Sequence, residues 1–140
     1  MTTRPAPTAP PAAPAAPGDR TLYERLGGYD AIAAATNDLL QRLFADPQLG
    51  VYWKGKGDDG KKRDIQLIAT YVVAAAGGPA YYGGRDMKLS HQGLGITGAE
   101  WARFMEHAEA TLRKFEVPAH EADEVLSFFT SLRGDIVEAA

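Results

Sequence analysis

The sequence predicts an all-α fold. Apolar residues recur at helical spacing, every three or four positions, in several long segments. Helix-breaking residues separate these segments, at Asp46-Pro47 and at Gly77-Gly78-Pro79. No segment shows the sustained alternation of apolar and polar residues that is typical of a half-buried strand. We therefore expect a helical domain without a sheet.

Length, charge and cysteine content exclude several classes of protein. A chain of 140 residues corresponds to one domain. Its net charge of -3 argues against nucleic-acid binding, which needs a basic surface. No apolar run approaches the ~20 residues of a membrane span, so we expect no membrane contact. The chain has no cysteine, which excludes disulfides and thiolate metal sites and agrees with a cytoplasmic location.

The chain divides into an N-terminal arm and one domain. Residues 1–20 are mostly proline, alanine and threonine, a composition with little apolar bulk to bury. We expect this arm to be disordered and partly polyproline II, without the apolar core of a signal peptide. The predicted domain spans residues 21–140 and opens with a short helical turn before Gly27-Gly28.

The first long helix is predicted over Tyr29–Ala45. Leu40 and Phe44 lie on the flank of its apolar stripe, and Asp46-Pro47 ends it, because the residue before a proline resists the α conformation. Residues 48–53 should form a short connection, followed by a mobile, glycine-rich loop over 54–60. The stripe itself consists of Ile32, Ala35, Thr36, Leu39 and Leu43.

A second helix, predicted over Lys61–Ala76, has two adjoining apolar faces. At about 100° per residue, one face carries Asp64, Ile68 and Tyr71. The other carries Ile65, Ala69, Val72 and Ala76. Two apolar faces suit a helix placed between a core and a bulky ligand.

Two further helices complete the predicted fold. Thr97 and Glu100 form a capping-box pattern that starts the first of them, which continues to about Phe115. Pro118 starts the last helix. Each carries one apolar stripe, the first with Trp101, Phe104, Met105, Ala108 and Leu112, the second with Ala122, Val125, Leu126, Phe129, Leu132 and Ile136.

The most informative segment, residues 81–97, places His91 in a glycine-rich turn between helices. A neutral imidazole at a helix end is a good iron ligand, and globin-like proteins hold haem iron in this way. The chain has three histidines. His107 and His120 fall on polar helix flanks, where we expect them to be solvated. His91 is therefore the candidate metal ligand.

Several motifs resemble the group I truncated haemoglobins. They are Tyr23-Glu24-Arg25-Leu26-Gly27-Gly28, Ala45-Asp46-Pro47-Gln48-Leu49, Gly77-Gly78-Pro79 and Tyr82-x-Gly84-Arg85-x-Met87-Lys88-x-x-His91-x-Gly93-x-Gly95-Ile96-Thr97. The resemblance covers about residues 21–137, with the motifs in the family's order. It implies a shortened globin fold, in which two antiparallel helix pairs stack two-over-two around a haem b.

The resemblance also implies roles for individual residues. His91 stands at the position of the proximal iron ligand, and Arg63 and Tyr82 stand where haem propionates could be met. The expected haem pocket consists of Leu40, Phe44, Trp53, Asp64, Ile68, Tyr71, Met87, Ile96 and Trp101.

The sequence departs from the family on the expected distal side. Many members carry a tyrosine that donates a hydrogen bond to oxygen, and Leu40 stands at that position. A glutamine common in the family is replaced by Ile68. Gln66 lies about 200° away around the helix and should point elsewhere. Asp64, as a carboxylate, would repel a negatively polarised ligand. The expected distal pocket is therefore apolar.

These features favour a haem protein that reversibly binds oxygen, nitric oxide or carbon monoxide. The alternative is a haem enzyme of nitric oxide, nitrite or peroxide chemistry, which would need an external reductase as a partner because the sequence shows no flavin or nicotinamide domain. A third hypothesis is a haem-free helical adaptor that works through its proline-rich arm. The absorption spectrum distinguishes the haem proteins from the adaptor.

Overall fold

A computed structural model describes residues 20–84 and 86–139, and the expected arm therefore lies outside the described residues apart from Arg20. Within the described residues the predicted all-α class is confirmed, with a single isolated β-bridge between Thr97 and Ala139. None of the described helices is both long and apolar enough to cross a membrane. The elements are α1 (Leu22–Arg25), α2 (Tyr29–Ala45), the 3-10 helix η1 (Gly50–Trp53), α3 (Asp58–Ala75), α4 (Met87–His91), α5 (Gly98–Lys114), α6 (Ala119–Ser131) and α7 (Arg133–Ile136).

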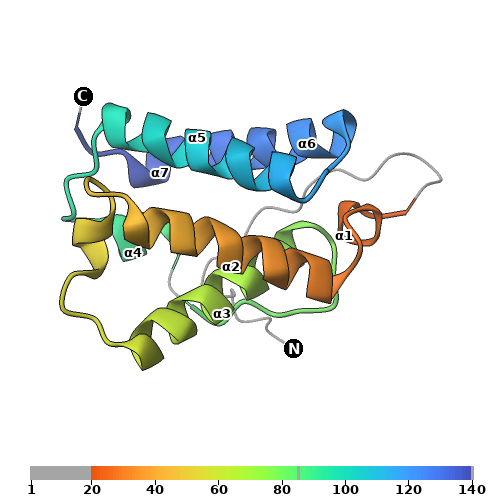
Figure 1. Cartoon of the computed structure of the whole chain (residues 1–140), viewed down its shortest axis with the longest axis horizontal. Helices are drawn as coiled ribbons and strands as arrows, with labels where there is room; N and C mark the ends of the chain where they lie inside the picture. The colour runs from red at the N-terminus through yellow and green to blue at the C-terminus, as the bar shows by residue number, and fades with distance from the viewer. Residues whose placement is uncertain (1–19, 85, 140) are drawn as a thin grey trace, which may run out of the picture.

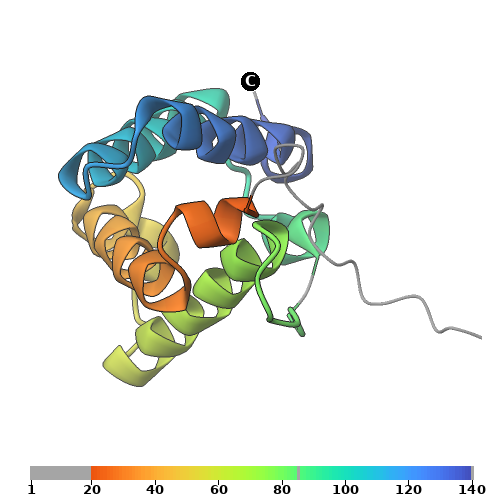
Figure 2. The same cartoon turned by 90° about the vertical axis from the view of Figure 1, so that its right-hand side faces the viewer.

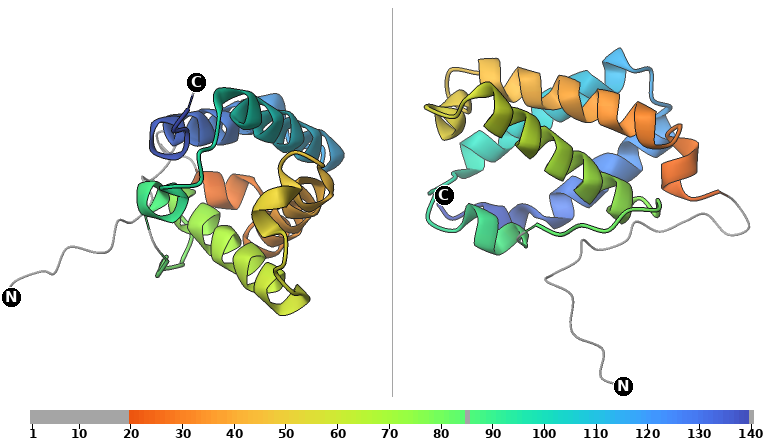
Figure 3. Two further views of the ribbon diagram at one scale, coloured as in Figure 1. Left: turned by 90° about the vertical axis from the view of Figure 1, so that its left-hand side faces the viewer. Right: turned by 90° about the horizontal axis from the view of Figure 1, so that it is seen from below.

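The long helices form two layers. Figures 1 and 2 show α5 and α6 side by side as one layer. Helices α2 and α3 form the second layer, which lies below the first in these views. Helix α2 connects the layers, because it packs against both α3 and α5. The short α4 lies against α7, near the start of α5 (Figure 3). The predicted two-over-two arrangement is therefore confirmed.

Local sequence explains most helix boundaries, but the second helix starts earlier than predicted, and the predicted last helix is divided at Leu132 into α6 and α7. The bounds of α2 match the prediction, and Thr97 caps α5 by accepting a hydrogen bond from the Glu100 amide at 3.1 Å. Helix α3 begins at Asp58, within the segment that we expected to be a loop. The acidic Asp58 and Asp59 occupy its first turn, where negative charge interacts favourably with the helix dipole. Charge at the helix start thus extends α3 into the glycine-rich segment.

The apolar interior consists of three clusters of buried residues. The α2 cluster is Leu39, Leu40, Leu43, Leu49 and Ala108. The α7 cluster is Tyr71, Tyr82, Trp101, Leu132 and Ile136. The α1 cluster is Leu22, Ala76 and Val125. Phe104 packs against the first two clusters and Phe129 against all three, so the clusters form one connected core.

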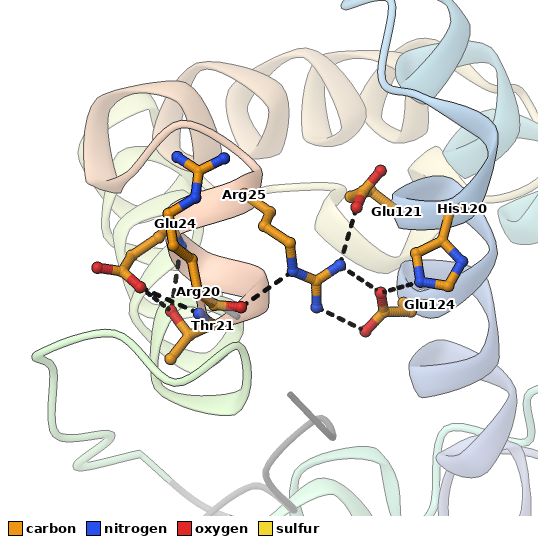
Figure 4. A network of polar contacts seen from close by, with 7 residues as sticks. All are labelled: Arg20, Thr21, Glu24, Arg25, His120, Glu121 and Glu124. Atoms are coloured by element: carbon orange, nitrogen blue, oxygen red, sulfur yellow. Dashed lines mark hydrogen bonds and ion pairs between the residues drawn. The ribbon is translucent and has the colours of Figure 1, made fainter. Parts of the chain in front are cut away.

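An ion pair fastens α1 to α6 (Figure 4). Arg25 Nη1 lies 2.8 Å from Glu121 Oε2 and 2.6 Å from Glu124 Oε2, and Nη2 donates to Glu124 Oε1 at 3.1 Å. Hydrogen bonds from Arg25 lower the pKa of both carboxyl groups. His120 is three-quarters exposed (75%), as expected from its polar helix flank. The positive charge of the Arg25 guanidinium therefore balances the negative charges of Glu121 and Glu124.

A buried carboxylate fixes the end of α2 to α5. The Asp46 side chain is only 1% exposed, and its Oδ2 lies 2.7 Å from both Arg103 Nη2 and His107 Nε2. Its Oδ1 accepts the Gln48 and Leu49 amides at 2.8 and 3.1 Å. The expectation that His107 is solvated was wrong, because its side chain is only 25% exposed and its Nε2 contacts this buried carboxylate. Asp46 thus connects the end of α2, the turn that follows it and α5.

Asp46 should make the stability of the protein sensitive to acid. The His107 contact, Arg103 and the two amides hold the Asp46 pKa well below its usual range, although burial opposes this. A depressed native pKa adds stability above the ordinary aspartate value of about 3.9, and this stability is lost as the pH falls below it. We expect Asp46→Asn to lower the melting temperature by several degrees at neutral pH, and to flatten the decline below about pH 4. Thermal unfolding followed by circular dichroism, with the exposed Asp123→Asn as a control, measures both effects. Parallel acid profiles for Asp46→Asn and the unmodified protein would contradict this role.

Candidate functional site

The candidate site is built around α4, which spans five residues and ends at His91. The Asp86 carboxylate caps this helix by accepting the Leu89 amide at 2.6 Å. A helix this short is not stable by itself in water, so tertiary contacts must hold it. One such contact is its packing against α7. The placement of His91 therefore depends on the surrounding fold.

One nitrogen of His91 has a fixed role. Nδ1 lies 2.9 Å from the Met87 carbonyl oxygen and 3.0 Å from Ser90 Oγ. A carbonyl only accepts hydrogen bonds, so this contact favours the tautomer with the proton on Nδ1. The lone pair of Nε2 is then available to a metal. A hydrogen bond from the second ring nitrogen to a carbonyl is the usual support of a metal-binding histidine.

Apart from Asp64, the predicted pocket residues fall into two groups, one on each of the two main clusters, the α2 cluster and the α7 cluster. Leu40 belongs to the α2 cluster, and the half-buried Phe44, Trp53 and Ile68 pack against it. The other group belongs to or packs against the α7 cluster and consists of Tyr71, Met87, Ile96 and Trp101. The fold joins the two groups through Phe104, which packs against both clusters and which the pocket prediction had not included.

The side chains of the expected distal side are either apolar or already hydrogen-bonded to other side chains. Leu40 is 1% exposed and Ile68 is half-buried. Asp64 Oδ2 accepts hydrogen bonds from Trp53 Nε1 at 3.1 Å and Lys56 Nζ at 2.8 Å. Gln66 is exposed and donates to the Tyr29 hydroxyl at 2.7 Å. The expected orientation of Gln66, away from Ile68, agrees with this contact.

The two residues expected near propionates lie in different surroundings. Arg63 is exposed on α3, whereas Tyr82 is buried with its ring 4.9 Å from the Tyr71 ring. Burial raises the pKa of Tyr71 to about 12, so this phenol stays protonated. Tyr82 is buried in the α7 cluster, and its contact with a propionate stays a prediction.

A surface pocket of about 350 Å³ lies where α2, η1 and the start of α3 meet. Phe44 and Trp53 form part of its wall, and Lys54, Lys56 and Lys61 also line it. Lys61 Nζ stands 5.2 Å from the centre of the Phe44 ring, within reach of a cation–π contact. This corner therefore combines aromatic surface with positive charge, and His91 is not among the residues that line it.

These residues fit a haem group. His91 offers one neutral nitrogen donor, and a single axial histidine is the usual iron ligand of globins. Half-buried apolar side chains on both main clusters, such as Phe44, Ile68, Met87 and Ile96, offer surface to a planar ring. Among the described residues, no buried side-chain nitrogen or oxygen lacks a hydrogen-bond partner, so these surfaces have no unsatisfied polar group that would oppose an apolar ligand.

Comparisons with known proteins identify the family of the chain. The family model described as bacterial-like globin matches residues 21–138. The group 1 truncated hemoglobin GlbN of Mycolicibacterium paratuberculosis is 31% identical over 117 residues, which cover 83% of each chain. This match and the family model together establish the family.

Two solved structures support the fold. The Fe(III) form of truncated hemoglobin from Tetrahymena pyriformis has a TM-score of 0.77 at 24% identity, covering 84% of this chain and 98% of its own. The 2/2 hemoglobin from Synechococcus, in the cyanomet state with covalently attached heme, gives the same TM-score, identity and coverage. The chain belongs to the bacterial-like globin family, among its group 1 truncated haemoglobins.

Proposed function

We propose that this globin holds a haem b through His91 and reversibly binds diatomic gases. The observation that carries the proposal is the His91 ring, whose Nδ1 is engaged by the Met87 carbonyl so that Nε2 remains available. The haem supplies an iron site for the gas. His91 would supply a nitrogen ligand to it, and the α2 and α7 clusters would supply apolar surfaces.

The side chains around Leu40 bear on gas selectivity. Leu40 and Ile68 have no hydrogen-bond donor, and the Trp53 indole N–H is used by Asp64. Oxygen is stabilised in haem proteins by a donor, since it carries partial negative charge, whereas carbon monoxide and nitric oxide depend less on one. We therefore propose a pocket that releases oxygen rapidly and favours carbon monoxide and nitric oxide relative to donor-equipped relatives.

Reconstitution with haem tests the function directly. We expect the purified chain to take up one haem per chain with a Soret band, and its reduced form to bind carbon monoxide reversibly. The haem should be extractable into acidified butanone, as a haem held only by coordination and packing is; the absence of cysteine excludes a thioether bond to it. Absorption titration and a pyridine haemochrome assay measure these outcomes. A colourless protein after reconstitution would refute the proposal.

A further inference from the structure

The loop that follows His91 makes few packing contacts of its own. Residues 92–95 are all exposed. Gly93 and Gly95 have positive φ angles of 87° and 70°, and a Cβ at either position would meet no atom within 4 Å. Side-chain packing therefore cannot explain how this loop is held. Polar contacts must do so.

Glu138, which lies 45 residues after Gly93 in the sequence, supplies these contacts. Its Oε2 accepts the Gly93 amide at 2.9 Å and its Oε1 accepts the Gly95 amide at 2.8 Å. Both bonds lower the pKa of Glu138, which keeps the carboxylate ionised. An ionised carboxylate can accept at both oxygens, and such charge-assisted bonds are stronger than neutral ones. One side chain thus holds two backbone amides of the loop.

The main chain around Glu138 reinforces the contact. The Glu138 and Ala139 amides both donate to the Ile96 carbonyl, at 2.9 and 3.2 Å, and the Gly98 amide donates to the Ala139 carbonyl at 3.2 Å. This segment directly follows α7, whose Ile136 is buried in the α7 cluster. The carboxylate is therefore anchored to the core, and the loop is anchored to the carboxylate.

We propose that Glu138 is a positioning residue for His91. By fixing Gly93 and Gly95, it fixes the end of α4 and so the direction of the imidazole. The proposal rests on the proposed function, in which His91 is the haem ligand. Its consequence is that the iron–histidine bond depends on a side chain that follows α7 and acts on the loop after His91.

The test compares Glu138→Ala and Glu138→Gln with Glu109→Gln, an exposed glutamate of α5, all reconstituted with haem. Resonance Raman spectra of the reduced proteins report the iron–histidine stretching band. Transfer of haem to an acceptor apoglobin reports the rate of haem loss, and amide hydrogen exchange reports protection at Gly93 and Gly95. Thermal unfolding separates a local effect from a global one.

We expect Glu138→Ala to shift and broaden the iron–histidine band, to expose both glycine amides and to lose haem about tenfold faster. Glu138→Gln keeps one acceptor oxygen and should give a smaller change in all three measurements. Glu109→Gln should match the unmodified protein. An unchanged band and unchanged glycine protection in Glu138→Ala would overturn the positioning role, while leaving haem binding intact. An unmodified, reconstituted protein without an iron–histidine band would instead refute the proposed function, and the positioning role with it.

Discussion

Replacement of His91 by alanine should abolish the iron–histidine band of the reduced protein and weaken haem retention by more than about 100-fold. Loss of residues that only support a metal ligand costs about 10- to 100-fold in affinity, so loss of the ligand itself should cost more. The apolar surfaces of both main clusters would remain, which leaves weak, non-coordinated haem binding. Resonance Raman spectroscopy and haem transfer to an acceptor apoglobin measure the two effects.

The control for this substitution is His120→Ala, because the His120 side chain is 75% exposed and lies on α6. It should change neither the band nor the retention. Free imidazole added to His91→Ala should restore a nitrogen-ligated spectrum, since it replaces the missing donor without repairing any other contact. Normal iron–histidine vibration in His91→Ala would show that another residue is the ligand.

Replacement of Leu40 by tyrosine should slow oxygen dissociation by roughly 10- to 100-fold. A hydrogen bond to a charged or strongly polarised group contributes ~1.5–3 kcal/mol, and each 1.4 kcal/mol corresponds to about tenfold in affinity. Leu40 is 1% exposed in a packed cluster, so the larger side chain should also lower the free energy of unfolding by about 1–3 kcal/mol. Stopped-flow displacement of oxygen and thermal unfolding measure these effects.

Leu40→Phe separates the hydroxyl from the ring. It introduces nearly the same bulk and should reproduce the loss of stability without the slower oxygen release. Carbon monoxide dissociation should change far less than oxygen dissociation in the tyrosine variant. Equal oxygen off-rates for the two variants would exclude a polar contact between residue 40 and the gas.

The helices could be predicted because their signals are local. A capping box at Thr97 and a stop at Asp46-Pro47 each involve residues within one helical turn. The predicted start of α3 is too late, because the glycines of this segment favour a loop while the charge of Asp58 and Asp59 favours a helix. Errors of this kind arise where two local preferences compete.

The polar contacts that hold the site could not be predicted, because they join distant segments. His107 and Arg103 are four residues apart on α5, and this spacing does place them on one face. Nothing in the sequence indicated that this face meets Asp46, which lies 61 residues from His107. Glu138 and Gly93 are separated by 45 residues and belong to no common motif. Such pairings follow only from the packed arrangement of the helices.

The connected core has a mechanical consequence. Phe104 and Phe129 each bridge the α2 and α7 clusters, and protein interiors are dense enough to transmit small displacements rather than absorb them. A displacement of the side chains around Leu40 is therefore transmitted to the α7 cluster, against which Met87 of α4 packs. If His91 holds haem iron as proposed, the iron–histidine bond and the gas pocket would then share one packed core.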